Sequence, residues 1–407
     1  MGGQGRAAWH LLRKEGFGAV RRRALWDLGR RFVDGELDFP LLPGDIADSG
    51  ALDLRAAAAA EPGRALRIGW VVHPPSPGSG GHTTLFRMVA AAEAAGHRCT
   101  VLLYDRYGGD PADRARVIRA GWPQMRAEIR DASRLDDLDV VVASSWDTAH
   151  VVATRTRNLP VHRAYFVQDY EPWFHPRGSE YALAEDTYRF GFHTITVGPM
   201  LASLLADEHG VEATVARFGC DTDVYRRTNF GARNGIAFYA RLANPRRGFR
   251  LGALALAEFH RRHPEIEIHM YGDADARVDF PVTSHGSVSP EALCDIYNRC
   301  VAGLALSFTN VTLITEELLA CGVVPVANDD PHAKASMANP QVRWVTPTPS
   351  AIADALSDAV ESTDGAELAA ATAASVESGG WEPAAEATVR SLESLATTGV
   401  RIPNGSR

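Results

Sequence analysis

The chain has 407 residues, of which 45% are apolar and 23% are charged, and this balance excludes a disordered chain, a collagen-like repeat and a small disulfide scaffold. Its 42 basic and 50 acidic residues give a formal charge of −8, which argues against the strongly basic domain typical of nucleic-acid binding. No stretch approaches the ~18 consecutive apolar residues of a membrane-spanning helix, and no secretory signal pattern opens the chain. We therefore expect two domains and a cytoplasmic protein without nucleic-acid partners.

Residues 1–33 form a basic segment with eight arginine or lysine residues against Glu15 and Asp27, and Trp9 and Trp26 lie among them. Such a helical segment suits the inner face of an anionic membrane, with arginines at the headgroups and tryptophans at the interface. The alternative is an arm that packs on the body of the protein or on a second subunit of a homodimer. The Gly-, Pro- and Ala-rich stretch that follows predicts a connector, so that residues 1–65 make up an extension and linker.

The next stretch, residues 66–228, alternates short apolar runs with helical patterns, which predicts a parallel sheet covered by helices on both faces. A helix is expected from Thr83 to Ala95, after a loop rich in proline and glycine. The expected strands are Ile68–Val72, Cys99–Tyr104, Val140–Ser144, Ala164–Gln168, His193–Val197 and Ala213–Phe218.

The same alternation begins again in residues 229–380 and predicts a second doubly wound, Rossmann-like domain. Its expected strands are Gly235–Ala240, Glu265–Tyr271, Ala302–Ser307 and Val323–Ala327, and its expected helices are Phe249–His260, Pro290–Arg299 and Thr315–Ala320. The fold class is therefore α/β, with two such domains facing across a cleft that holds the ligand at the carboxyl ends of the strands. Residues 381–407 predict a helix that returns to the first domain and a tail from Ile402.

Two loops offer groups that bind phosphate. Gly80 and Gly81 stand between a strand and a helix, where free N–H groups favour an anion, although a tight turn without a ligand is the alternative. Arg241 and Arg247 follow the strand Gly235–Ala240, where two guanidinium groups would neutralise a pyrophosphate unless they form only a solvated basic turn. Only two lysines occur in the chain, at positions 14 and 334, so arginine is the expected phosphate ligand.

A third candidate site follows the strand Ala302–Ser307. The loop and first helical turn from Val311 and Thr312 onward offer N–H groups and hydroxyls to a phosphate. Glu317, inside the helix, is placed to accept hydrogen bonds from ribose hydroxyls, unless it is a solvated charge on the helix face.

Two features favour a structural role over metal binding. Asp221 and Asp223 form a D-x-D string, but their place in an interdomain turn favours capping over metal coordination. The five cysteines form no C-x-x-C pair and are interpreted as buried apolar residues in a reducing compartment.

In this order and spacing, the motifs resemble the GT-B glycosyltransferases of family four over about residues 66–360. The segment from Phe218 to Tyr225 is similar to the interdomain segment of that family, and Glu317-Leu318-Leu319-Ala320-Cys321-Gly322 is similar to its E-A-M-A-C-G motif. The resemblance implies that Arg241, Arg247 and the Gly80-Gly81 loop lie at the donor phosphates and that Glu317 holds the ribose. One departure is Thr309, which occupies the position of a glutamate that contacts the donor sugar.

The segments Gly80-Gly81-His82, Gln168-Asp169-Tyr170-Glu171-Pro172 and Tyr239-Ala240-Arg241 look like the WsaF-type rhamnosyltransferases of surface-polysaccharide assembly, which also carry an N-terminal extension. This resemblance implies dTDP-L-rhamnose as the nucleotide-sugar donor and a glycan or glycolipid as the acceptor. The loss of one carboxylate at Thr309 suits a 6-deoxy sugar, which has one hydroxyl fewer.

The expected reaction transfers the sugar to an acceptor hydroxyl, and its arginines and helix start replace a divalent metal, so we expect no cofactor or metal ion. An inverting reaction needs a base, for which Asp169 is the first candidate and His82 the second; the alternative for Asp169 is a turn cap. Trp173 is expected to stack on an acceptor sugar, with core packing as the alternative. Two other functions remain open, namely a transferase with another nucleotide-sugar donor and a non-catalytic scaffold of the same fold.

Overall fold

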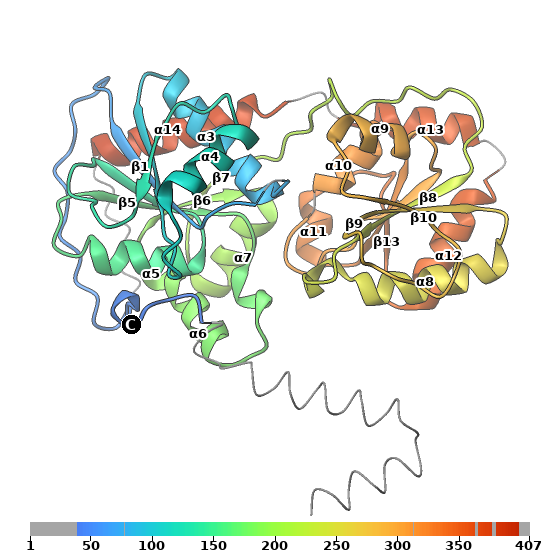
Figure 1. Ribbon diagram of the computed structural model, residues 1–407, viewed down its shortest axis with the longest axis horizontal. Coiled ribbons are helices and arrows are strands. Elements are labelled where there is room, and N and C mark those ends of the chain that lie inside the picture. Colours follow the sequence, from blue (N-terminus) through green and yellow to red (C-terminus); the bar gives the residue numbers. More distant parts are fainter. Residues whose placement is uncertain (1–38, 77, 312, 363–364, 377–379, 399–407) are drawn as a thin grey trace, which may run out of the picture. The chain divides into compact units, whose positions relative to one another are not determined.

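The computed structural model describes residues 39–76, 78–311, 313–362, 365–376 and 380–398 of the chain (Figure 1). Residues 1–46 and 47–407 are two separate units, and the described part of the shorter unit contains a turn of 3-10 helix, Pro43–Asp45. The basic segment 1–33, Thr312 and the tail from Ile402 lie outside the described residues.

The first sheet is seven-stranded, and its strands pair in parallel in the order β3-β2-β1-β4-β5-β6-β7. The strands are β1 Arg67–Val72, β2 Arg98–Leu103, β3 Glu128–Asp131, β4 Val140–Ala143, β5 His162–Val167, β6 His193–Val197 and β7 Ala213–Ala216. The helices are α3 Gly80–Ala94, α4 Pro111–Gly121, α5 Trp146–Arg155, α6 Ser179–Asp186 and α7 Pro199–His209, with short 3-10 turns at Glu171–Phe174 (η2) and Thr187–Arg189 (η3). All six predicted strands are present, and β3 was not predicted.

The first sheet is buried because helices cover both of its faces. Trp70 in β1 is fully buried and packs edge-on against Phe166 of β5, with 6.4 Å between ring centroids. A Cβ at Gly69 would lie 2.5 Å from the Leu138 side chain, so only glycine fits at that point of β1. This packing explains why the central strands β1 and β4 are almost continuously apolar in the sequence.

The second sheet has six strands, all parallel, in the order β10-β9-β8-β11-β12-β13. They are β8 Gly235–Ala240, β9 Glu267–Gly272, β10 Thr283–Gly286, β11 Ala302–Leu304, β12 Val324–Asn328 and β13 Arg343–Val345. The helices are α8 Phe249–Arg262, α9 Pro290–Tyr297, α10 Leu313–Ala320, α11 Pro331–Ser336, α12 Pro349–Val360 and α13 Gly365–Ala374, and a 3-10 turn, η4, spans Pro245–Arg247. The two parallel α/β sheets confirm the predicted fold class.

Each sheet with its helices forms one lobe, and the chain crosses between the two lobes twice. The two crossings lie against each other. A Cβ at Gly219, in the first crossing, would lie 2.5 Å from the carbonyl oxygen of Gly380, in the second, so glycine permits this close approach. The last described helix, α14 Glu382–Thr398, then packs on the first sheet and buries Leu392 and Ala396 in its core. No described helix is both long enough and apolar enough to span a membrane.

Candidate functional site

The carboxyl ends of the two sheets are joined by a cluster of polar side chains around Asp169. This residue follows β5, and its carboxylate lies 2.9 Å from Nη1 of Arg246, in the turn η4 after β8. The hydroxyl of Thr309, in the loop after β11, donates a 2.8 Å hydrogen bond to the same carboxylate. The sequence predicted Asp169 at a site between the sheets, but it did not predict its two partners.

Two further side chains, those of Phe174 and Asn310, hold this junction together. The guanidinium of Arg246 stacks over the ring of Phe174, 4.6 Å from its centroid. The amide of Asn310 donates to the carbonyl oxygens of Gln168 and Val197, at 2.8 and 3.3 Å. Because Asn310 is buried, these bonds satisfy polar groups that have lost their water.

Arg247 lies next to this junction, and its charge is available to an anionic ligand. Its Nη1 donates to the hydroxyl of Ser307 at 3.0 Å, and no carboxylate of the described residues forms an ion pair with it. Burial lowers the pKa of Arg247, and the positive charge of Arg246 adds to this effect. A cation whose charge is disfavoured in this way gains from the arrival of an anion.

Arg241 begins the same loop, directly after β8, but is already paired. Its Nη1 lies 3.0 Å from Oδ1 of Asp273, and the other oxygen of Asp273 accepts from the backbone N–H of Leu242 at 2.7 Å. The Arg241 side chain is 44% exposed, so it can share its remaining donors with a ligand. Of the two predicted arginines, Arg241 therefore forms an ion pair with Asp273, whereas Arg247 forms no ion pair among the described residues.

Glu317 lies in α10, beside Tyr297. Burial and the negative charge of Asp221 raise the pKa of Glu317 to about 7. A hydrogen bond from Tyr297 favours the charged form and partly opposes this increase. The Tyr297 hydroxyl is also 2.6 Å from that of Tyr271. A half-buried carboxyl group of this kind is suited to hydrogen-bond hydroxyls, as predicted for a ribose.

The other predicted phosphate groups are placed as follows. The N–H of Val311 donates to Oδ1 of Asn310 at 2.8 Å, so a phosphate would have to displace that bond. Thr312 lies outside the described residues. Gly80 and Gly81 form the first turn of α3, which begins three residues before the predicted start at Thr83. Their N–H groups thus lie at a helix N-terminus, where an anion is favoured.

His82 is the second residue predicted as a base, and its ring nitrogens have partners in the structure. Ser79 Oγ is 2.8 Å from its Nδ1, and the carbonyl oxygen of His73 is 3.2 Å from its Nε2. Burial lowers the pKa of His82 to about 4, so its ring is neutral near pH 7. Both ring nitrogens are thus engaged, one by the N-cap residue of α3 and the other by the residue that follows β1.

Sequence reasoning missed three titratable residues at the carboxyl edge of the first sheet. Nε2 of His73, directly after β1, lies 2.5 Å from the buried carboxylate of Asp147, at the start of α5. Burial opposes the charged form of both groups, but their mutual attraction prevails, raising the pKa of His73 and lowering that of Asp147. The signal available in the sequence was a polar residue directly after an apolar strand.

Glu171 is the third of these residues and is buried in the turn η2. Its carboxyl group accepts hydrogen bonds from the backbone N–H of Trp146 and, at 3.3 Å, from the hydroxyl of Tyr165. Burial and the negative charge of Asp147 raise the pKa of Glu171 to about 8, so it is protonated at neutral pH. Asp169 and Glu171, only two residues apart, therefore have different surroundings: an arginine faces one and burial neutralises the other.

The D-x-D string has the structural role that its position favoured. Both carboxylate oxygens of Asp221 accept from Arg87 of α3, at 2.8 and 2.5 Å, and its carbonyl accepts from Val224 and Tyr225 in a turn. The cysteines are all buried and unbridged. Within the described ranges, no group of three or more metal-ligating side chains has a geometry that could hold an ion.

Trp173 lies on the rim of a pocket of about 180 Å³. Its side chain is 38% exposed and packs edge-on against Tyr170, with 4.7 Å between centroids. The pocket is lined by Trp173 and Met200 from the first lobe and by Ser307, Phe308, Asn310, Asn328, Asp329, Asp330, Ala333 and Pro347 from the second. Trp173 is thus available to a ligand and is not buried in the core.

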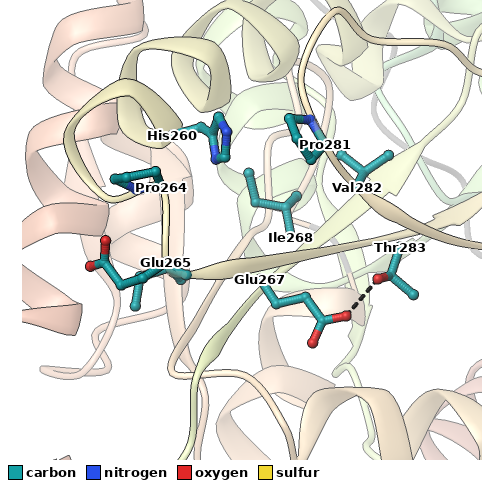
Figure 2. A pocket seen from close by; sticks show the side chains of 9 residues that line it. His260, Pro264, Glu265, Glu267, Ile268, Pro281, Val282 and Thr283 are labelled. Atoms are coloured by element: carbon teal, nitrogen blue, oxygen red, sulfur yellow. Dashed lines mark hydrogen bonds between the residues drawn. The ribbon is translucent and has the colours of Figure 1, made fainter.

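A second pocket, of about 320 Å³, lies elsewhere (Figure 2). It is lined by Glu267 and Thr283, the first residues of β9 and β10, whose side chains are hydrogen-bonded at 2.5 Å, and by Pro264 and Pro281 before these strands. These residues mark the amino ends of the strands, whereas parallel sheets bind ligands at the carboxyl ends. The candidate site is therefore at the Asp169 junction.

Comparisons with known proteins show what the chain is similar to. Residues 124–199 match the family profile "WsaF, N-terminal domain", and residues 234–357 match "WsaF, C-terminal domain". The O-antigen biosynthesis protein RfbC of Myxococcus xanthus is 32% identical over 302 residues, which are 68% of this chain but only 23% of that protein. The matched segment thus spans about a quarter of RfbC.

Solved structures show the same fold. HepE of Anabaena, in complex with UDP-glucose, has a TM-score of 0.63 at 14% identity and covers 81% of this chain and 100% of its own. The sucrose-phosphate synthase of Thermosynechococcus elongatus has a TM-score of 0.60 at 13% identity and covers 81% of this chain and 99% of its own. At such identities the likeness concerns the fold alone. The chain therefore has the GT-B fold, and the two WsaF profiles match its strands β3 to β6 in the first sheet and β8 to β13 in the second.

Proposed function

We propose that the protein is a glycosyltransferase that moves a sugar from a nucleoside diphosphate to a hydroxyl of a cell-surface glycan or lipid-linked saccharide. The two WsaF domains and the relative named for O-antigen biosynthesis support a place in polysaccharide assembly. HepE, which shares the fold, was crystallised with UDP-glucose and with UDP, and this supports a nucleotide sugar as the donor.

The observation that carries the proposal is the unpaired, half-buried Arg247 at the carboxyl end of β8. Sugar transfer leaves negative charge on the departing diphosphate, and a donor aimed at that charge is worth about 3 kcal/mol. Arg247 supplies the charge, Arg241 shares its exposed donors, and the N-terminus of α3 at Gly80 and Gly81 adds backbone N–H groups. With these groups in place, the proposed reaction needs no divalent metal.

The donor is proposed to be dTDP-L-rhamnose, with Glu317 on the ribose. Thr309, whose hydroxyl is held by Asp169, presents no carboxylate of its own to the donor sugar. That suits a 6-deoxy sugar, which has fewer hydroxyls to recognise.

In the inverting form of the reaction, Asp169 is the base. The acceptor oxygen forms a bond to the anomeric carbon, the bond from that carbon to the phosphate oxygen breaks, and its electron pair leaves with the diphosphate. The acceptor proton passes to the Asp169 carboxylate, which must first release Thr309 or Arg246. His82 is the second candidate, with both ring nitrogens occupied.

Calorimetric titration with dTDP, UDP and GDP, and then with dTDP-L-rhamnose, tests the proposal. Selective binding of dTDP, followed by release of dTDP from dTDP-L-rhamnose when a rhamnose-containing glycan is added, supports the rhamnosyltransferase. Preference for UDP or GDP would keep the reaction and replace the sugar. A protein that binds none of these nucleotides would be a non-catalytic scaffold, the second candidate function.

The basic segment 1–33 is proposed to hold the enzyme at the inner face of an anionic membrane. Its arginines and tryptophans are the supporting observation. Co-sedimentation with phosphatidylserine-containing liposomes, for the full chain and for a chain that starts at residue 47, tests this. Equal and negligible binding by both chains would leave the alternative, an arm that packs on the protein or on a second subunit, which sedimentation velocity would detect as a dimer.

A further inference from the structure

We propose that the pocket between Trp173 and Asp330 binds an uncharged sugar unit of the acceptor. This inference rests on the proposed glycosyltransferase function and names the acceptor class of the same site. The pocket measures about 180 Å³ and is lined from both lobes. Aromatic faces, carboxamides and carboxylates meet in it, and these three groups together distinguish a saccharide from an apolar ligand.

The first component is a set of exposed aromatic rings. Trp173, Phe174 and Phe308 are 38%, 39% and 39% exposed. Trp173 and Phe308 line the pocket, and Phe174 lies nearby beneath the guanidinium of Arg246. Large apolar side chains left in contact with water mark a binding surface when they gather in one place. The C–H face of a pyranose ring is an apolar surface of matching size.

The second component is a set of polar side chains that still have an unused hydrogen-bond donor or acceptor. Oδ1 of Asn328 accepts from the N–H of Ser307 at 2.7 Å, while its Nδ2 has no partner among the described residues and can donate. Oδ1 of Asp330 accepts from Ala333 N at 2.8 Å as the cap of α11, which leaves the second oxygen to accept. A donor and an acceptor side by side match the vicinal hydroxyls of a sugar.

The charge of the pocket excludes an acidic sugar. Asp329 and Asp330 both line it, and only Asp329 is neutralised, by Lys334 at 2.7 Å. Of the two nearby cations, Arg246 is neutralised by Asp169, and Arg247 is the one that the proposed function assigns to the donor diphosphate. One uncompensated carboxylate therefore faces the pocket and would repel the carboxylate of a uronic acid or a sugar phosphate.

The position of the pocket assigns it to the acceptor. Asn328 bonds to the backbone of Ser307, whose hydroxyl accepts from Arg247, so one residue separates the pocket from the arginine proposed for the donor diphosphate. Met200 and Ala333, which also line the pocket, pack together with Val311 in a small apolar cluster. A sugar seated here lies beside the phosphate site without occupying it.

Saturation-transfer-difference NMR on the full chain tests the proposal, with methyl α-L-rhamnopyranoside as the uncharged probe and methyl α-D-glucopyranosiduronate as the acidic one. We expect transfer to the uncharged glycoside and not to the uronide. The variants Trp173→Ala and Phe308→Ala should weaken binding about fivefold each, the size of one aromatic contact. Phe230→Ala, which removes a ring 71% exposed just before the amino end of β8, is the matched control and should bind as the wild type does.

A charge variant tests the selectivity while it keeps the fold. Asp330→Asn retains a helix-capping oxygen and removes the charge, so it should fold normally and admit the uronide. If the wild type bound both probes equally, or if Phe230→Ala weakened binding as much as the two pocket variants, the pocket assignment would be wrong.

A comparison of nucleotide binding with the glycoside signal separates this inference from the proposed function. Calorimetry with dTDP reports on the donor site alone, whereas the glycoside signal reports on the pocket. Nucleotide binding without any glycoside signal would overturn the pocket and spare the transferase. A glycoside signal that saturating dTDP-L-rhamnose abolishes but dTDP does not would assign the pocket to the donor sugar and overturn the acceptor. A signal that survives both nucleotides supports the proposal.

Discussion

The Asp169 carboxylate, which follows a strand of the first sheet, lies 2.9 Å from the Arg246 guanidinium, which follows a strand of the second. Their side chains are 13% and 20% exposed, so the pair is largely shielded from water. A shielded pair is costly to break because the remaining charge has lost its hydration. Any substrate that enters between these residues must therefore replace the contacts that it displaces.

At this junction the hydroxyl of Thr309 should contribute more to the free energy of unfolding than its methyl group does. Thr309→Val keeps the shape of the side chain and removes the 2.8 Å bond to Asp169, so we expect a loss of about 1 kcal/mol in the free energy of unfolding. Thr309→Ser keeps the hydroxyl and removes one buried methyl group, so it should lose less, about 0.8 kcal/mol. Urea unfolding of the three proteins measures the difference, and a Thr309→Val protein as stable as the wild type would show that the hydroxyl contributes nothing.

Asp169→Asn should separate chemistry from binding. An asparagine can still accept from Thr309, but it cannot take a proton, so turnover should fall by about a hundredfold or more while the affinity for dTDP stays within about twofold. Steady-state release of dTDP and calorimetry measure the two quantities. Undiminished turnover would remove Asp169 from the role of base and leave it as the partner of Arg246.

Glu171 should make the protein less stable as the pH rises. Its pKa is about 8 in the folded protein and about 4.5 when exposed, so between these values the folded state holds a proton that the unfolded state has lost. The free energy of unfolding should then fall with increasing pH, with a slope of up to about 1.4 kcal/mol per pH unit from this group.

The variant Glu171→Gln carries no titrating proton and keeps an oxygen for the N–H of Trp146. Its stability should change less than that of the wild type between pH 6 and pH 9, and at pH 9 it should exceed the wild type. Thermal unfolding of both proteins at the two pH values checks this. Parallel curves for the two proteins would contradict the assignment of the buried proton to Glu171.

His73 should titrate above its usual value of 6.5 because the Asp147 carboxylate outweighs the effect of burial. Asp147→Asn removes the charge and leaves the burial, so the pKa of His73 should fall below 6.5. Proton NMR of the imidazole signals follows both titrations, and the signal lost in His73→Gln gives the assignment. A pKa that stays the same in Asp147→Asn would refute the coupling of the two residues.

Much of the fold followed from apolar runs. The strands His193–Val197 and Gly235–Ala240 have the predicted bounds, and Gly235–Ala240 is the unbroken apolar run typical of a buried parallel strand. The strands β3, β10 and β13 were missed because none of their residues is fully buried and each has only three or four residues. The start of α3 was placed too late because Gly80 and Gly81 disfavour a helix interior and resemble a loop.

The site was predicted in part, and the limit was tertiary contact. Arg247, Glu317 and Asp169 each follow a strand or belong to a helix that follows one, so their positions could be read from local pattern. The pairing of Asp169 with Arg246 and of His73 with Asp147 joins residues more than 70 positions apart, which no local pattern contains.

The binding of dTDP to Arg247→Gln tests the central claim most directly. Glutamine can still donate to Ser307 but carries no charge, so its affinity for dTDP should fall by about tenfold to a hundredfold, the value of one charge-assisted hydrogen bond. Arg261→Gln, at the far end of α8 and 69% exposed, is the matched control and should bind as tightly as the wild type. If Arg247→Gln bound dTDP with unchanged affinity, the diphosphate would not lie at Arg247, and the proposed donor site would be wrong.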